Sequence, residues 1–556
     1  MQVLAVVVAV AALLLAGAAS SADARASDFE PRYALEPPQT IAAARASLWR
    51  QVREARADQR VRLYVALKLR NTAALESTLY AVSTPSSPRY GAHLTRRQLA
   101  DLVAPEPRAV HQVCRWLAHL NATHYDSERW RRRSNNDEFD EMPRCGALQD
   151  TVFTHDWIVV DTTVDIASAM LGARLFEFQH ELVHSWRIVR TLEYRVPSHI
   201  ASLIDIVAGI SHFPSKLGSL RARRAFQQHQ QQQQQEQQRL GPKLAMQRQR
   251  AAEATSTAPP SNQIVTPAVL RKHYNITVTS GIMANNSQGV HEFEEQWYSE
   301  SDLSLFLQRN ALPNATVAVQ VGFNNVSRPG GEAELDLQYI MGVGVNVPTW
   351  FVYVPGVNPR NQEEPFLEWI LLMLQLPHAP WINSISYGES ERSYSGAYLT
   401  RVAAELQKFG VLGHSLLFSS GDYGVGCDCS QPNQTQYVAH FPSSSPYVTS
   451  VGATTAAYDL AGNPTNVEVG IPFSGGGFST HFARPSYQND AVTRFLSTSP
   501  LPPASFFNAS NRGYVDVCAY GWNYEIIENG KYLEPSPIVV VVVASGFSST
   551  HSLTRS

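Results

Sequence analysis

The chain has 556 residues, of which 44% are hydrophobic and 17% are charged, so it carries enough apolar material for large buried cores and is not a disordered protein. Its 45 basic and 48 acidic residues give a formal net charge of -3. This near-neutral balance argues against a nucleic-acid-binding protein and against a protein of anionic membrane surfaces as first interpretations.

The sequence begins with an apolar run of the length found in secretory signal peptides. Residues 3–18 read VLAVVVAVAALLLAGA and end in small residues that fit the A-x-A cleavage pattern. We therefore expect residues 1–18 to be a signal peptide. No later apolar run reaches the roughly 18 residues of a membrane helix, so no membrane span is expected. Seven N-x-S/T sequons agree with the secretory route, at Asn121, Asn275, Asn285, Asn314, Asn325, Asn433 and Asn508.

The sequence contains five cysteines, at positions 114, 145, 427, 429 and 518. In an oxidising compartment an odd count means either an unpaired thiol or a missing partner. Cys427 and Cys429 are too closely spaced for the usual zinc knuckle, and no second pair completes four ligands. A disulfide role is therefore the preferred interpretation for them.

A Gln- and Arg-rich segment divides the chain. Residues 219–261 contain a glutamine run at 227–238 with arginines on both sides, and they have no apolar pattern that could pack a core. Two interpretations stay open: a linker that other proteases cleave at its arginines, and a solvated spacer. We expect one domain over residues 27–218 and a second over residues 262–556.

The first domain is predicted to be a small α+β unit, with strands at 62–69 and 157–161 and helices at 75–82 and 97–103. Strands and helices alternate in the second domain. We expect strands at 317–321, 349–354, 381–386, 415–418 and 538–544, and helices at 292–308, 362–376 and 398–409. The alternation predicts an α/β fold with a mostly parallel sheet covered by helices on both faces. In such folds functional sites gather at the carboxyl ends of the strands.

One motif in the first domain suggests a metal. Residues 180–184 read HELVH, which matches the H-E-x-x-H pattern of zinc peptidases. That pattern holds zinc only when both histidines share one helix face. Apolar and polar residues alternate from Phe176 to Ile188, which predicts a strand with His180 and His184 about 13 Å apart. We therefore expect no zinc site there.

The segment GGEAELDLQY at 330–339 is the better candidate for chemistry. If a helix begins near Gly331, Glu332 and Asp336 lie at positions i and i+4 of one face, and Glu334 points nearly opposite. Two carboxylates in one environment can share a proton, which raises one pKa and yields a base suited to acid. The alternative is a solvated acidic helix start that the helix dipole favours.

Three Gly- or Ser-rich turns follow in the second domain. The turn SSGDYGVG at 419–426 comes after an apolar strand and exposes Asp422 at the strand end. The turn SGGGF at 474–478 is a second loop with exposed backbone. The apolar run at 539–544 leads into the turn SGFS at 545–548. A strand that runs into a tight turn is a common way to expose a nucleophilic serine, so Ser548 is a candidate nucleophile.

Together these segments resemble the sedolisins, or serine-carboxyl peptidases, from about residue 60 to residue 550. YVALKLRN, VSTPSSPRYGAHLT and LADLVAPEP are similar to the family's inhibitory prosegment. TPAVLRKHYNIT, GGEAELDLQYI, SISYG, SSGDYGVGC, FPSSSPYVTSVGATT and SGGGFSTHFARPSYQ are similar to its peptidase domain. The resemblance implies a subtilisin-like sheet preceded by a small α+β prodomain. It also implies an acid peptidase zymogen of the tripeptidyl-peptidase type.

The family's site residues carry over to four positions. By resemblance Ser548 is the nucleophile, Glu332 the general base, Asp336 the residue that orients it, and Asp422 the oxyanion-hole acid. A glutamate base suits acidic solution, where imidazole would be charged. Asp422 must be protonated to donate a hydrogen bond, which burial and acid would both favour.

The resemblance also implies binding partners, a cellular location and a metal ion. We expect peptide or protein substrates, the prodomain as an intramolecular inhibitor, and a lysosomal or extracellular location. Calcium is expected for the family, but the Asp- and Gly-rich loop that binds it is absent from this chain.

The sequence departs from the family near the proposed nucleophile. The turn reads SGFSST where the family has S-G-T-S-A-S, Tyr423 replaces a serine, and residues 514–538 match poorly. Eight residues follow Ser548, where the family continues with a helix and the calcium loop. The alternative function is therefore a catalytically inactive, truncated relative that binds peptides or acts as an inhibitor.

Overall fold

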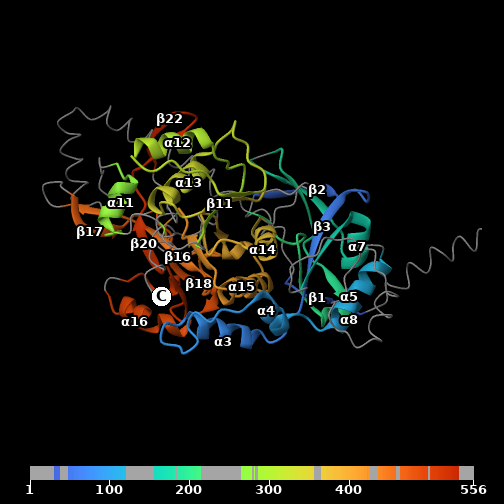
Figure 1. The fold of residues 1–556 in the computed structure, drawn as a ribbon. Coiled ribbons are helices and arrows are strands. Elements are labelled where there is room, and N and C mark those ends of the chain that lie inside the picture. Colours follow the sequence, from blue (N-terminus) through green and yellow to red (C-terminus); the bar gives the residue numbers. More distant parts are fainter. Residues whose placement is uncertain are drawn as a thin grey trace, which may run out of the picture.

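The computed structural model describes residues 31–37, 48–120, 156–182, 184–214, 264–277, 281, 286–355, 365–422, 424–425, 436–458, 464–471, 473–498 and 501–536. The expected signal peptide, the Gln-rich segment, the strand at 538–544 and Ser548 lie outside these residues. Figure 1 shows an N-terminal part, described within residues 31–214, beside a C-terminal part, described within residues 264–536.

Small antiparallel sheets and short helices build the N-terminal part. The three-stranded sheets have the orders β4-β3-β8 and β2-β5-β6, and β1 pairs with β7. The strands are β1 (Arg32–Ala34), β2 (Trp49–Glu54), β3 (Arg60–Leu67), β4 (Trp157–Thr163), β5 (Phe176–His180), β6 (Arg187–Arg190), β7 (Arg195–Pro197) and β8 (Ile204–Ala208). The helices are α3 (Thr72–Ser83), α4 (Arg96–Val103), α5 (Pro107–His119), α7 (Val164–Leu171) and α8 (Ser198–Ala201). The predicted α+β class is confirmed, and β3, β4, α3 and α4 match the predicted elements.

The histidines of the H-E-x-x-H motif do not share a helix. His180 is the last residue of β5, and β6 begins at Arg187, so the chain turns between two paired strands. Our prediction of one continuous strand was wrong, because the chain reverses after His180. The His180 ring packs edge-on against Trp49 and Trp186. The described residues contain no group of three or more His, Cys, Asp or Glu side chains that could hold a metal ion.

An eight-stranded sheet forms the centre of the C-terminal part. Its order is β10-β11-β9-β12-β14-β16-β17, and β20 also pairs with β16. Every pair from β10 to β16 is parallel, and β17 is antiparallel. These strands are β9 (Gln288–Glu292), β10 (Val319–Val321), β11 (Thr349–Tyr353), β12 (Ile382–Ile385), β14 (Ser415–Ser419), β16 (Thr449–Tyr458), β17 (Pro464–Gly470) and β20 (Val517–Tyr520). The predicted mostly parallel sheet is confirmed.

Shorter strands lie outside this sheet, and they pair as β13 with β15, β18 with β19 and β21 with β22. Their bounds are β13 (Glu389–Ser390), β15 (His440–Phe441), β18 (Gly477–Ala483), β19 (Asn511–Tyr514), β21 (Tyr524–Glu528) and β22 (Lys531–Ser536). Single 3-10 turns are η2 (Glu391–Ser393), η3 (Ser486–Gln488) and η4 (Ala504–Phe506).

Helices cover both faces of the large sheet, as predicted (Figure 1). Successive residues of a strand point to opposite faces of a sheet, and β11 shows this. Phe351 belongs to a buried apolar cluster that includes residues of α12 and α13, whereas Val352 belongs to one that includes residues of α14 and α15. The helices of this part are α11 (Pro267–His273), α12 (Glu300–Arg309), α13 (Gly331–Val343), α14 (Pro365–Gln375), α15 (Gly396–Val411) and α16 (Asn489–Leu496).

The strand β9 corrects the prediction of a helix from residue 292. All five residues of β9 are buried, although only Val290 is an aliphatic residue. The helix starts eight residues later, where the Ser299 hydroxyl accepts a hydrogen bond from the Asp302 backbone nitrogen at 3.3 Å. The apolar spacing between residues 292 and 299 was therefore misread.

The two parts of the molecule share one apolar cluster. Leu79 and Trp157 of the N-terminal part belong to the same buried cluster as Trp369 and Leu406 of the C-terminal part. Helix α3 packs on α15 (Figure 1). A Cβ atom built on Gly410 of α15 would lie 2.4 Å from Leu79 Cδ1, so a larger residue at 410 would require the Leu79 side chain to shift.

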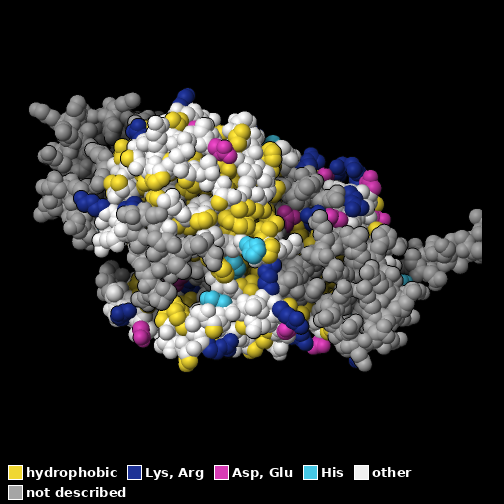
Figure 2. All heavy atoms as spheres, viewed as in Figure 1, with side chains coloured by type: hydrophobic (Ala, Val, Ile, Leu, Met, Phe, Trp, Pro, Cys, Tyr) yellow, Lys and Arg dark blue, Asp and Glu magenta, His cyan; other side chains and the backbone are white. Residues whose placement is uncertain are grey.

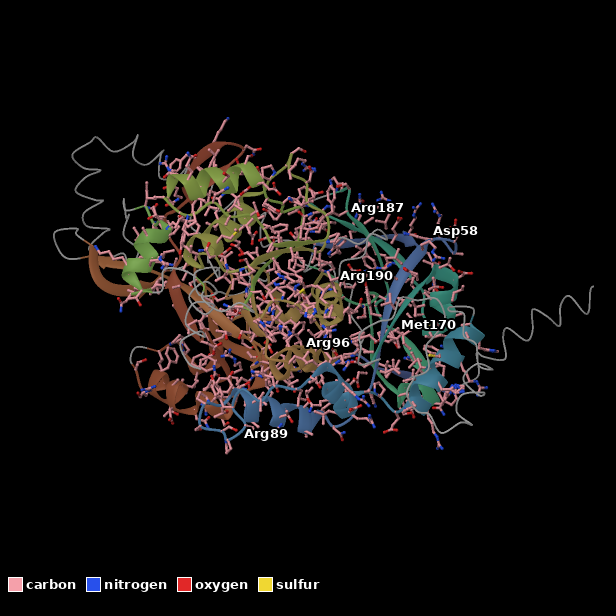
Figure 3. All side chains as sticks on the ribbon, viewed as in Figure 1. Asp58, Arg89, Arg96, Met170, Arg187 and Arg190 are labelled. Carbon is pink, nitrogen blue, oxygen red and sulfur yellow. The ribbon has the colours of Figure 1, made fainter. Side chains whose placement is uncertain are left out.

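A basic side chain also joins the two parts. Arg96 of α4 is labelled in Figure 3, where α4 meets the C-terminal part, and it donates to the Gln375 carbonyl oxygen at 3.2 Å. That oxygen belongs to the last residue of α14, where the helix dipole favours a cation. The contact is therefore electrostatic as well as apolar.

The surface carries mixed charge. Figure 2 shows basic and acidic side chains scattered over one face, with apolar side chains gathered in a band across its middle. Among the described sequons, Asn275, Asn314 and Asn508 are exposed, as glycosylation requires, and Asn325 is half-buried. Among the described residues, no helix is both long enough and apolar enough to cross a membrane.

Two cysteines lie in the described part of the chain. Cys114 is disulfide-bonded, and Cys518 is a free, exposed thiol. The other three cysteines, at 145, 427 and 429, fall outside the described residues.

Candidate active site

Helix α13 begins at Gly331, as the sequence predicts. The Gln296 side chain approaches its first turn and accepts a hydrogen bond from the Glu332 backbone nitrogen at 3.2 Å. A Cβ atom on Gly330 would lie 2.1 Å from the Gln296 Oε1 atom. Glycine at 330 is therefore what lets Gln296 satisfy a backbone donor at the helix start.

The acidic residues of α13 lie in different surroundings. Glu334 is fully buried and accepts hydrogen bonds from the Ser299 backbone nitrogen at 2.7 Å and from the Gln338 side chain at 2.9 Å. Asp336 accepts instead from the Ser386 hydroxyl at 2.5 Å, just beyond the carboxyl end of β12. Asp336 is buried and Glu332 is half-buried, so this pair is not the solvated acidic helix start of the alternative interpretation.

Asp336 is held in an environment that favours its neutral form. The side chain is 1% exposed. The pKa of Asp336 is raised to about 7, mainly by burial. The Ser386 hydrogen bond lowers this pKa, and the nearby Asp422 carboxylate raises it. The second oxygen, Oδ1, is buried and has no hydrogen-bond partner in the structure.

A further carboxyl group, that of Glu292 at the end of β9, lies at this site and was not predicted from the sequence. It is fully buried and accepts a hydrogen bond from the Tyr387 hydroxyl at 2.9 Å. Burial raises the pKa of Glu292 well above its usual value, and the carboxylates of Asp336 and Glu332 raise it further. No sequence signal marked it, because β9 itself was not recognised.

Asp422 follows β14 on a turn that two glycines make possible. Gly421 has a positive φ of 96°, and its carbonyl accepts a hydrogen bond from the Gly475 nitrogen at 2.8 Å. A Cβ atom on Gly475 would lie 1.9 Å from the Ser420 carbonyl oxygen. The two predicted Gly-rich loops are thus packed against each other.

The side chain of Asp422 is exposed at this turn, so burial does not contribute to keeping it protonated.

The structure brings together three of the four predicted site residues. Asp422 acts electrostatically on Asp336, and Asp336 and Glu332 act on Glu292, so each of the four carboxyls lies within electrostatic range of another, although their exposure differs. Glu332 is half-buried and the most accessible group of α13 among the three acids. Ser548 lies outside the described residues.

Glu292→Gln is expected to remove a pH-dependent cost in stability. A carboxyl whose pKa is raised by folding binds its proton more tightly in the folded state, so its stability contribution falls as pH rises from the unfolded pKa toward the folded one. The neutral amide should therefore raise Tm by about 2–4 °C at pH 7 and change it little in acid. Differential scanning calorimetry of the Ser548→Ala chain measures this. An equal shift at both pH values, or the same shift in exposed Glu300→Gln, would contradict it.

Comparison with known proteins places this chain in a family. Residues 47–133 and 147–213 match the model described as Pro-kumamolisin, activation domain. Human tripeptidyl-peptidase 1 is 36% identical over 491 residues, which cover 86% of this chain and 76% of that protein. The chain belongs to the tripeptidyl-peptidase 1 family. The bovine tripeptidyl-peptidase 1 is 37% identical over 493 residues, with the same shares covered.

A solved structure was also matched. Pseudomonas sedolisin, a serine-carboxyl proteinase complexed with two molecules of pseudo-iodotyrostatin, has 20% sequence identity and a TM-score of 0.39. The match covers 53% of this chain and 82% of that chain.

Membership of the tripeptidyl-peptidase 1 family makes the protein a serine-type peptidase with an N-terminal activation domain. We call the N-terminal part the prodomain and the C-terminal part the peptidase domain. The calcium ion implied by the resemblance finds no ligand set among the described residues, since no group of three or more metal-binding side chains occurs there.

Proposed function

We propose that the protein is the zymogen of an acid serine-carboxyl peptidase that releases tripeptides from the free N-termini of peptides. The observation that carries this proposal is the group of carboxyls formed by Glu332, Asp336 and Glu292 next to the Asp422 turn. The tripeptide specificity rests on the similarity to relatives that are tripeptidyl-peptidases. The enzyme would act in an acidic compartment reached through the secretory pathway, lysosomal or extracellular.

The chemistry begins with Ser548. Its hydroxyl oxygen attacks the scissile carbonyl carbon while its proton passes to Glu332, and the carbonyl oxygen becomes an oxyanion. Protonated Asp422 donates a hydrogen bond to that oxyanion. Glu332 then returns the proton to the leaving amine, and a water molecule hydrolyses the acyl-enzyme by the same two proton transfers.

The burial pattern supports glutamate as the base in acid. The raised pKa values of Asp336 and Glu292 keep both groups protonated in acidic solution. Glu332 is only half-buried, so it is the member of this group best placed to stay ionised and accept the serine proton. The free Oδ1 of Asp336 leaves one oxygen available to orient Glu332.

The prodomain and the Gln-rich segment fit a zymogen. Acidification of the purified precursor to between about pH 3 and 6 should shorten the chain within residues 219–261 and release activity on a fluorogenic tripeptide substrate. Gel mobility and N-terminal sequencing locate the cut, and fluorescence follows the activity. Ser548→Ala should abolish both changes if the protein processes itself.

The competing function is an inactive relative that binds peptides or inhibits. The departures around Ser548 and Tyr423 are the observations that favour it. An acid-treated protein that shows no activity anywhere in this pH range, yet still binds peptides, would replace the peptidase proposal with this one.

A further inference from the structure

An exposed aromatic ring stands two residues before a sequon on the loop between β10 and α13. The loop reads FNNVSRPG over residues 323–330, and Asn325, Val326 and Ser327 form the N-x-S sequon. Phe323 is 64% exposed and Val326 is 60% exposed. Two apolar side chains therefore lie in solvent on either side of the sequon asparagine.

The loop that carries Phe323 is fixed to the rest of the peptidase domain. The Asn324 side chain accepts a hydrogen bond from the Tyr298 backbone nitrogen and donates one to the Tyr298 carbonyl, both at 3.1 Å. At the other end of the loop, the Gly330 nitrogen donates to the Trp297 carbonyl at 2.8 Å. The exposure of Phe323 is thus set by a well-anchored backbone.

One neighbouring ring contacts Phe323. It packs edge-to-face with Trp297, with ring centroids 6.1 Å apart and an interplanar angle of 84°. Such a contact covers at most one face of the phenylalanine ring. With 64% of the residue exposed, at least one flat apolar face is left for a further partner.

The sequon itself adopts a hydrogen-bonded turn. The Asn325 Oδ1 atom accepts from the Ser327 hydroxyl at 2.7 Å and from the Ser327 nitrogen at 3.3 Å. The Arg328 nitrogen donates to the Asn325 carbonyl at 2.9 Å, which closes the turn. Among the described residues, none of the hydrogen bonds of Asn325 uses its Nδ2 atom, which is the atom that N-glycosylation modifies.

The other described sequons lack this combination. Asn508 also has a phenylalanine two residues earlier, but Phe506 is half-buried and packs edge-to-face with Tyr437. The Asn508 Nδ2 atom already donates to the Asn511 side-chain oxygen at 3.2 Å. The residues at the same position before Asn275 and Asn314 are His273 and Leu312, and both are half-buried. Of these four, only Asn325 has an exposed aromatic ring at this spacing.

We propose that Asn325 carries an N-linked glycan whose first sugar stacks on the open face of Phe323. The Cα atoms of residues two apart lie at most about 7 Å from each other, so the linked sugar can reach the ring. The C–H groups of a pyranose ring are weakly positive and the face of an aromatic ring is negative, so the two attract each other. The sugar would cover apolar surface and stabilise the loop that leads into α13.

The modification is a transfer from a lipid-linked oligosaccharide pyrophosphate during secretion. A bond forms between Asn325 Nδ2 and the anomeric carbon of the first sugar. The bond from that carbon to the pyrophosphate oxygen breaks, and the lipid pyrophosphate and one amide proton leave. This proposal does not depend on peptidase activity.

The full chain, secreted from eukaryotic cells that attach high-mannose glycans, tests the proposal. Glycopeptide mass spectrometry should show that Asn325 is modified. Hydrogen exchange at pH 7 then compares three forms of the protein: with the intact glycan, trimmed by an endoglycosidase to the first sugar, and freed of all sugar by an amidase. The amidase leaves a carboxylate at position 325, which can still accept the hydrogen bonds of Ser327.

The trimmed form should exchange as slowly as the intact form, because the first sugar makes the contact. In the sugar-free form the loop amides, including those of Arg328 and Gly330, should exchange about fivefold faster, as expected for the loss of one aromatic stacking contact. Phe323→Ala should exchange faster than the parent and change less than about twofold when its sugar is removed. Asn314→Gln removes a sequon without an exposed aromatic ring and, as the matched control, should leave the exchange of the loop unchanged.

Three results would overturn the proposal. The first is a secreted chain in which Asn325 is unmodified. The second is an equal rate of loop exchange in the intact and sugar-free forms of the parent. The third is a Phe323→Ala chain that responds to sugar removal as the parent does. If this last variant also raises KM for a fluorogenic tripeptide substrate, the ring contacts peptides instead of sugar. The first two results are read on the parent chain and do not require a variant to fold.

Discussion

Glu332→Gln is expected to lower kcat on a fluorogenic tripeptide substrate by about 1,000-fold, with KM nearly unchanged. The amide cannot accept the serine proton, whereas its size and the start of α13 are preserved. The Glu332 backbone nitrogen keeps its hydrogen bond to Gln296, so the helix is expected to stay in place. Steady-state kinetics of the acid-activated protein measure the effect.

The matched control for this variant is Glu300→Gln. Glu300 is an exposed carboxyl in the first turn of α12. Its replacement by glutamine is the same chemical change at a position away from the site. Its kcat should stay within about twofold of the parent. Loss of activity in both variants would point to a general effect of charge removal, and full activity in Glu332→Gln would exclude Glu332 as the base.

Asp422→Ala is expected to lower kcat by about 100- to 1,000-fold, again with little change in KM, because the donor to the oxyanion acts in the transition state. Asp422→Asn should retain more activity than Asp422→Ala, since an amide also donates. The aspartate works only when protonated, so activity that depends on it is lost as pH rises through its pKa. An asparagine does not titrate, and its pH profile should extend further toward neutrality.

An exposed carboxyl outside the site provides the comparison for Asp422. Asp490→Asn alters a surface residue at the start of α16 and should leave both kcat and the pH profile unchanged. Equal activity in Asp422→Ala and Asp422→Asn would show that hydrogen-bond donation at this position is not used. An Asp422→Asn profile that coincides with the parent profile would show that this carboxyl does not titrate in the working range.

Much of the fold could be predicted because local patterns and tertiary environment agree. Helix α13 starts at Gly331, where two glycines precede an acidic and apolar run. The parallel strands β11 and β14 are mainly apolar sequences, as strands buried on both faces usually are. The turn carrying Asp422 could be predicted because glycine at 421 is needed for a positive φ.

The strand β9 could not be predicted, because its burial depends on partners far along the chain. Gln288 donates to the Ile340 carbonyl at 3.1 Å and to the Thr349 hydroxyl at 3.0 Å. The His291 ring lies between the Trp369 indole nitrogen at 2.8 Å and the Asn383 side-chain oxygen at 2.9 Å. Polar residues are stable in this sheet only because these contacts satisfy them.

The same limit hid two carboxyls. Glu292 is the last residue of β9. Because this strand was not predicted, the position of Glu292 at the site could not be predicted either. Asp156 stands in the sequence as an ordinary acidic residue before a strand, and nothing local marks it. Its complete burial depends on Arg401 and Lys408, about 250 positions later, where a helix presents both to the same oxygen.

The apolar cluster that joins the two parts bears on biogenesis. The prodomain is synthesised first, so the surface around Leu79 and Trp157 can be in place before Trp369 and Leu406 leave the ribosome. Helices α14 and α15 then meet a ready-made hydrophobic template instead of water. The order of the two parts along the chain thus lets the earlier part cover the apolar faces of α14 and α15 as soon as these helices are synthesised.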